Sequence, residues 1–134
     1  MERLPRIRLF VFFFLLIPSS VFADFLDEYR WENRLILVKS QTSAPMLELM
    51  QQQDALRERE IIWFCLKGDT LYHNSPRDLP ENVKIQLLQY FAGDLVSLLI
   101  GKDGIIKSKD NYWDLENYLK QVDTMPMRQQ EMSN

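Results

Sequence analysis

The sequence predicts an α/β fold around one mixed four-stranded sheet, with the element order β-α-β-α-β-β-α. Two short aliphatic runs, at 34–40 and 60–66, are typical of buried strands that form a parallel pair. A segment with apolar residues at helical spacing lies between them, as a right-handed crossover requires. Farther along the chain, Asp103-Gly104 separates two apolar runs, which indicates an antiparallel hairpin.

The first half of the chain supplies a strand, a helix and a second strand. RLILVKS at 34–40 is the first strand, and TSAPMLELMQQQDALRERE at 42–60 is a helix that a hydroxyl side chain can cap and whose first turn holds Pro45. EIIWFCL at 60–66 is apolar at every position after Glu60, as in a strand covered on both faces. The expected apolar stripe of the helix is Met46, Leu49, Met50 and Leu56.

Two more helices follow, separated by the predicted hairpin. Residues 67–78 are expected to form a loop, and 79–93 a second helix that stops at Gly93. Residues 111–123 form the third helix, and a tail at 124–134 closes the chain. The expected inward side chains of the two helices are Val83, Leu87, Leu88, Phe91, Leu115, Tyr118, Leu119 and Val122.

The stretch LLIGKDGIIKS at 98–108 has two possible interpretations, a phosphate-binding loop or a hairpin turn. A nucleotide loop needs more glycines and a helix directly after it, usually with Lys-Ser or Lys-Thr at the junction. Here a second apolar run follows instead. The stretch therefore predicts a hairpin whose turn holds Gly104 in the left-handed conformation at a bulge.

These elements form one domain, at 24–134, with a thioredoxin-like fold: two parallel strands joined by a crossover, then a hairpin and a last helix. Residues 1–23 read as a signal peptide, with three arginines, an unbroken apolar run and small residues before the cleavage point. The nine apolar residues would span only about 14 Å as a helix, about half of a bilayer core. We expect a periplasmic or secreted protein that has no membrane association after cleavage.

The net charge argues against nucleic-acid binding, and the cysteine content excludes an internal disulfide. Without the signal peptide the chain carries 13 basic and 18 acidic side chains, a net charge of −5, which repels nucleic acid. Cys65 is the single cysteine, so an internal disulfide is excluded.

Three stretches resemble a known family. YRWENRLILV at 29–38, LLIGKDGIIK at 98–107 and VDTMPMRQQEM at 122–132 look like the hallmarks of an exported bacterial family of domains of unknown function. Its domain is similar to one in vertebrate sushi-repeat and coiled-coil extracellular matrix proteins. The resemblance implies a thioredoxin- or peroxiredoxin-like fold and export, but no firmly assigned activity.

The chain departs from working thioredoxins at the active-site position. They place Cys-x-x-Cys where the first strand meets the first helix, because the helix N-terminus stabilises the thiolate. The equivalent stretch here, VKSQTSAPM at 38–46, holds no thiol, and a serine or threonine without a base beside it is a poor nucleophile. A dithiol mechanism is therefore excluded.

The remaining reactive side chains also have structural interpretations. Cys65 lies among apolar residues, which favours a packing role over a dimer-forming or peroxide-sensing thiol. His73 is a single histidine in a polar loop, where metal binding would need further nitrogen or sulfur ligands. The methionines near the C-terminus suggest Cu(I) but more often pack in cores. No metal and no cofactor is expected. No poised pair is visible among four aspartates: Asp94, Asp103, Asp110 and Asp114.

The most interesting residues are predicted to meet at one end of the sheet, which we call the polar pole. The first strand begins at the end where the hairpin turns over, and the last helix runs back toward it. One interpretation is a clasp that fastens the tail, with Asp103 or Glu131 paired to an arginine and Trp31 covered by methionines. The other is a surface that binds an anionic group through Arg128 or Lys102. The polar pole comprises Arg30, Trp31, Arg34, Lys102, Asp103, Arg128 and Glu131.

The sequence thus predicts a binding or adaptor module of the cell envelope without a redox centre, whose partner is an envelope protein or an anionic small ligand. The alternative is a peroxiredoxin-like or other cryptic enzyme that uses Cys65 or the polar pole around Lys102 and Arg128.

Overall fold

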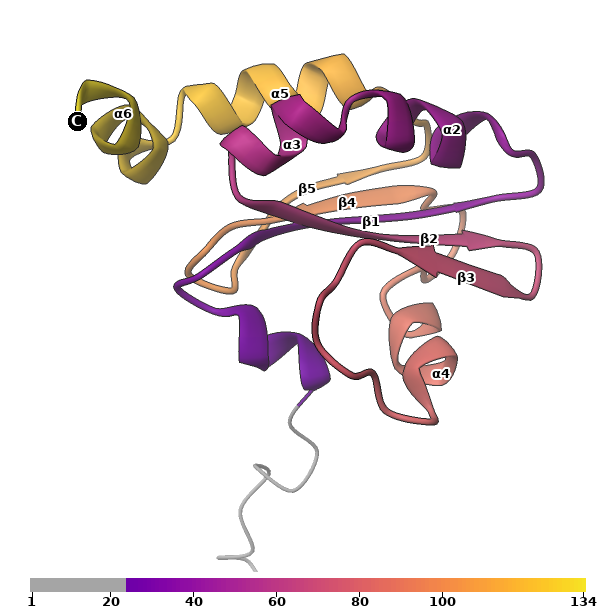
Figure 1. Cartoon of the computed structure of the whole chain (residues 1–134). Helices are drawn as coiled ribbons and strands as arrows, with labels where there is room; N and C mark the ends of the chain where they lie inside the picture. Colours follow the sequence, from indigo (N-terminus) through magenta and orange to yellow (C-terminus); the bar gives the residue numbers. More distant parts are fainter. Residues whose placement is uncertain (1–23) are drawn as a thin grey trace, which may run out of the picture.

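A five-stranded mixed sheet lies between two layers of helices (Figure 1) in the computed structural model, which describes residues 24–134. The predicted signal peptide, 1–23, lies outside the described residues. Along the sheet the strands follow the order β3-β2-β1-β4-β5. The strands are β1 (Arg34–Ser40), β2 (Ile61–Lys67), β3 (Thr70–His73), β4 (Ser97–Ile100) and β5 (Ile106–Asp110).

The pairing confirms the two strand relationships that the sequence predicted. β1 runs parallel to β2, from Arg34 opposite Ile61 to Ser40 opposite Lys67. β4 pairs antiparallel with β1 and with β5, so the hairpin is present, with a register shift after Leu99. The sheet is therefore mixed, with its parallel pair at the centre.

The prediction of four strands is wrong, because residues 67–78 do not form only a loop. Gly68, with φ +58°, turns the chain back, and β3 pairs antiparallel with the second half of β2. β3 is short, mostly exposed and has a neighbour on one side only. Such an edge strand needs no apolar alternation, so its sequence carries little strand signal.

Helices cover both faces of the sheet. In Figure 1, α2, α3 and α5 lie over one face, while α4 and a 3₁₀ helix at Phe25–Tyr29 lie over the other. α6 lies beyond the end of the sheet, next to the C-terminus. The α-helices are α2 (Ala44–Gln51), α3 (Gln53–Glu58), α4 (Val83–Leu88), α5 (Leu115–Asp123) and α6 (Pro126–Ser133).

The helices differ from the prediction in four ways. The single helix expected at 42–60 is broken at Gln52 into α2 and α3, and α4 is shorter than the 15 residues expected. The tail at 124–134, expected only to close the chain, forms α6 after Pro126. Two of the expected inward side chains, Met50 and Leu88, are each 54% exposed.

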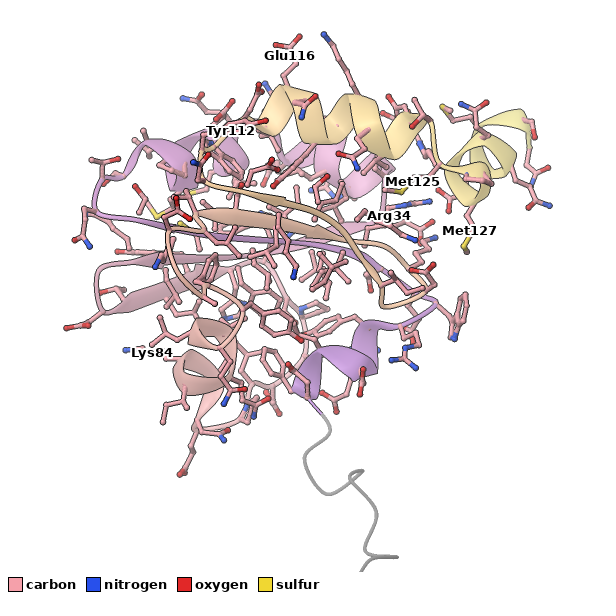
Figure 2. The ribbon with its side chains drawn as sticks, turned by 180° about the vertical axis from the view of Figure 1, so that it is seen from behind. Arg34, Lys84, Tyr112, Glu116, Met125 and Met127 are labelled. Carbon is pink, nitrogen blue, oxygen red and sulfur yellow. The ribbon has the colours of Figure 1, made fainter. Side chains whose placement is uncertain are left out.

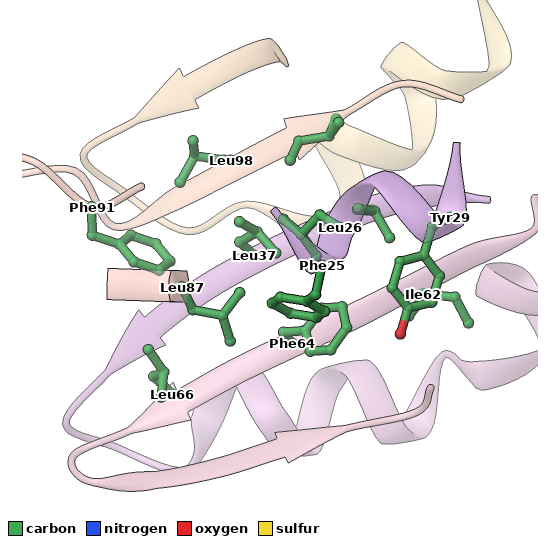
Figure 3. Close-up of a cluster of buried hydrophobic side chains, with 12 residues drawn as sticks. Phe25, Leu26, Tyr29, Leu37, Ile62, Phe64, Leu66, Leu87, Phe91 and Leu98 are labelled. Carbon is green, nitrogen blue, oxygen red and sulfur yellow. The ribbon is translucent and has the colours of Figure 1, made fainter. Parts of the chain in front are cut away.

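Alternating residues of the strands form two cores, one on each face. On the α4 face, Leu35 and Leu37 of β1 join Phe64 of β2 and Phe91 (Figure 3). On the α5 face, Ile36 and Val38 of β1 and Trp63 of β2 pack against the buried side chains of α2, α3 and α5. Because β1 and β2 are covered on both faces, residues 35–38 and 61–66 are all apolar and do not alternate with polar residues.

Candidate functional site

The polar pole forms at the end of the sheet where β1 begins and the β4–β5 hairpin turns. Figure 2 shows Arg34, Met125 and Met127 together there, beside the link between α5 and α6. The structure brings three of the predicted cations, Arg34, Lys102 and Arg128, around the carboxylate of Glu131. These four residues therefore lie together, while a binding role for them stays a prediction.

Glu131 receives hydrogen bonds from two buried cations. Arg34 donates from Nη1 to Oε1 and from Nη2 to Oε2, each at 3.2 Å, and Lys102 donates from Nζ to Oε2 at 2.7 Å. The Arg34 side chain is 1% exposed and that of Lys102 is 8% exposed. Arg34 also donates to the Arg59 carbonyl, and Lys102 to Glu60. The geometry is a two-pronged arginine–carboxylate pair reinforced by an ammonium group.

Arg128 makes a second group of contacts in this network, with residues of α3 and α5. Its guanidinium donates to Asp123 Oδ1 at 3.3 Å, to the Glu58 carbonyl at 3.1 Å and to Glu58 Oε1 at 3.3 Å. Asp123 also accepts two hydrogen bonds of 2.9 Å from Arg59. α6 is thus joined to α3 and α5 by charged groups.

Sequence reasoning missed four partners: Glu58 at the end of α3, Arg59 and Glu60 in the link to β2, and Asp123 at the end of α5. A signal for three of them was present, because parallel strands begin at the same edge of a sheet. The charged run RERE at 57–60, directly before β2, therefore had to lie beside the start of β1.

The network favours the ionised forms of Glu131 and Asp123. Burial alone would raise the pKa of Glu131, but hydrogen bonds from Arg34 and Lys102 outweigh it and hold that pKa below its ordinary value. The hydrogen bond from Arg59 is the main reason why the pKa of Asp123 is lowered. Among the described residues, every buried side-chain nitrogen and oxygen has a hydrogen-bond partner. These properties fit a clasp, because the charges are matched inside the chain.

The turn between β4 and β5 needs its two glycines for different reasons. A Cβ on Gly101 would lie 2.5 Å from Cε of Lys107, whose stem folds over the turn. Gly104 has φ +81°, and a Cβ there would lie 2.7 Å from Nε of Arg30. The stretch is therefore a hairpin turn, as predicted, onto which two cationic side chains pack.

Of the two carboxylates predicted for pairing with an arginine, Glu131 is the one that does so, with Arg34. Asp103 instead pairs with Lys107 at 2.8 Å and accepts from the Ile105 N–H. The predicted covering of Trp31 by methionines is wrong. Trp31 is 63% exposed rather than covered by methionines, and its φ of 70° is rare for a bulky residue. Its N–H donates to the Lys102 carbonyl, which holds this turn against the hairpin.

A cleft of about 520 Å³ adjoins the network, between the hairpin and the α5–α6 link. Its lining combines Lys102 and Lys107 with the apolar side chains of Met125, Pro126 and Met127. Met127 is 40% exposed, and the Lys107–Asp103 pair is on the surface. This is the part of the polar pole that a ligand or partner could contact without opening the buried ion pairs of Arg34, Lys102 and Arg128.

The remaining candidates lie away from the polar pole. Cys65 is fully buried, and burial raises the pKa of its thiol to about 11. His73 ends β3 rather than lying in a loop, and its ring stacks on Phe64 with centroids 6.0 Å apart. Asp110 accepts a hydrogen bond from Tyr118, and Asp114 caps α5.

Among residues 24–134, no group of three or more His, Cys, Asp or Glu side chains could hold a metal ion. No helix described there is long and apolar enough to cross a membrane.

Comparison with known proteins gives one match. A family model described as "Domain of unknown function (DUF4174)" matches residues 25–131, which includes every element of the sheet. No curated protein and no solved structure matches the chain.

Proposed function

Since the chain belongs to the DUF4174 family of domains of unknown function, we propose that it is an exported binding or adaptor module of the cell envelope, with a thioredoxin-like fold and no redox centre. The proposal has three parts, which are the fold, the absence of thiol chemistry and the binding surface.

The strand order supports the thioredoxin-like part of the proposal. Without the edge strand β3, the order β2-β1-β4-β5 begins with the parallel pair β2-β1, and the two antiparallel strands β4 and β5 follow. The crossover helices after β1 lie on one face and α4 on the other (Figure 1). The resemblance to exported thioredoxin-like domains, also found in vertebrate matrix proteins, points the same way.

The burial of Cys65 is the observation that carries the functional part. A nucleophilic or redox-active cysteine must be accessible and ionised near neutral pH. Cys65 is fully buried, with a pKa of about 11, and the link from β1 to α2 contains no other cysteine. A module that binds, rather than a thiol enzyme, agrees with this environment.

The polar pole is the proposed contact surface, and an envelope protein or an anionic small ligand is the proposed partner. Its accessible groups are Trp31, Met127 and the Lys107 ammonium beside the 520 Å³ cleft. Tryptophan and methionine are enriched in protein interfaces. Lys107 is held by one surface ion pair, which contributes only about 0–1 kcal/mol, so it can be redirected to a carboxylate of the partner.

Affinity capture from envelope extract tests the proposal. Exposed residues are the suitable positions, because replacing the buried Arg128 or Lys102 would destabilise the fold. We expect Trp31→Ala and Lys107→Gln each to reduce capture of a partner while the melting temperature stays near that of the wild type. Glu116→Gln, on the exposed side of α5, is the matched control. Equal capture by all variants would exclude the polar pole as the contact surface.

A further inference from the structure

A second cleft, of about 480 Å³, lies at the opposite end of the sheet, where β1 and β2 finish. At this point the chain leaves β1 for α2 on one face, whereas β2 leads to β3 and then to α4 on the other face. In open α/β sheets, ligands bind at such carboxyl ends, where neighbouring connections diverge. The cleft is lined by Lys39, Ser40, Gln41, Leu66, Gly68, Leu88 and Val96.

Lys39 gives this cleft an uncompensated positive charge. Its Nζ lies 5.6 Å from the centroid of the Phe91 ring, and it forms no ion pair with another described residue. No carboxylate is among the residues that line the cleft. The buried cations of the polar pole differ in this respect, since each of them contacts a carboxylate.

Apolar side chains form the opposite wall of the cleft. Leu66 lies opposite Lys39 in the β1–β2 register, so both side chains are on the α4 face of the sheet. Figure 3 shows Leu66, Leu87 and Phe91 together at this end of the sheet. Leu88 of α4 is 54% exposed although it borders this wall, and a Cβ on Gly68 would meet nothing within 4 Å. The space is therefore open and bounded by hydrocarbon.

From this combination we propose that the cleft binds a small apolar carboxylic acid. Its carboxylate pairs with the Lys39 ammonium, and its hydrocarbon body packs on Leu66, Leu88 and Val96. One ammonium group matches the single charge of a carboxylate, whereas a phosphate ester carries further negative charge that no second cation in the lining would neutralise. An apolar pocket with a few polar groups that fix orientation is the usual form of a small-molecule site.

Calorimetric titration of the purified protein with octanoate tests this assignment. We expect saturable binding of octanoate, and affinities at least about tenfold lower for octanol and octylamine, because a charge-assisted hydrogen bond contributes about 1.5–3 kcal/mol. In amide NMR spectra, octanoate should shift the signals of Ser40, Gly68 and Val96. Shifts confined to the polar pole, or equal binding of octanol and octanoate, would overturn the proposal.

Three variants separate the site from non-specific binding. Lys39→Gln and Leu88→Gln should each weaken octanoate binding about tenfold, since one removes the charge and the other the apolar wall. Lys84→Gln is the matched control: this lysine is exposed on α4, is outside the cleft lining and forms no ion pair with a described residue. Unchanged affinity in Lys39→Gln would refute the assignment. Binding of a peptide that ends in leucine, without binding of octanoate, would also refute it.

Discussion

Replacing Glu131 with glutamine is the sharpest test of the polar pole as a clasp. The side chain keeps its shape and one carbonyl oxygen, but the negative charge shared by Arg34 and Lys102 is lost. The side chains of Arg34 and Lys102 are only 1% and 8% exposed, and each would then lack its closest counter-ion. We expect a large loss in the free energy of unfolding.

The geometry sets the size of this loss. Removing one partner of a buried ion pair costs about 3–5 kcal/mol because it leaves an uncompensated charge. Glu131 is 24% exposed, so solvent already screens part of the interaction, and the glutamine oxygen still accepts a hydrogen bond. The expected decrease is therefore about 2–3 kcal/mol. For a domain of this size, it corresponds to a melting temperature lower by about 10 °C.

Urea unfolding followed by tryptophan fluorescence, together with thermal circular dichroism, measures the change. Glu116→Gln provides the control, because its pair with Lys120 has side chains that are 77% and 75% exposed, and exposed pairs contribute at most about 1 kcal/mol. If Glu131→Gln unfolds within about 0.5 kcal/mol of the wild type, as ordinary surface substitutions do, the clasp interpretation is wrong.

Three further predictions follow from the same structure. Gly104→Ala should destabilise the protein more than Gly68→Ala, because both glycines have positive φ but only Gly104 has a side chain packed against it. Comparison of the urea midpoints of the two variants measures the difference. Equal midpoints would contradict the packing described. Cys65 should react with a thiol reagent at pH 7.5 only when the protein is unfolded, because the thiol is buried and its pKa is raised to about 11; rapid labelling of the native protein would favour the enzyme alternative. Because the pKa values of Glu131 and Asp123 are lowered in the folded protein, these groups contribute stability that is present above about pH 5 and is lost as the pH falls through their folded-state pKa values. The urea midpoint of the wild type should therefore fall in acid. It should fall less steeply in Glu131→Gln.

The parts of the fold that could be predicted from sequence are those where a local pattern and burial agree. β1 was expected at 34–40 and is found there, because both of its faces are covered and residues 35–38 are all apolar. The hairpin was equally clear, since a glycine after aspartate matches the left-handed turn position.

The missed elements are stabilised by contacts distant in sequence. β3 depends on its pairing with β2, and α6 has no apolar stripe, since its only buried side chain is that of Arg128. Periodicity cannot detect a helix that is attached through charged groups. The location of the polar pole could be predicted from chain topology. Its partners in and directly after α3 and in α5 could not, because their position depends on how the helices pack.

The attachment of α6 has a practical consequence for handling the protein. Terminal residues can often be removed without harm, and the exposed end at Asn134 tolerates an added tag. Deleting the last ten residues is different, because it strips Arg34 and Lys102 of the acid group that neutralises them while leaving both in the interior. The shortened chain should be poorly expressed or prone to precipitate, although the only apolar residue it loses from the edge of the core is the partly buried Met125.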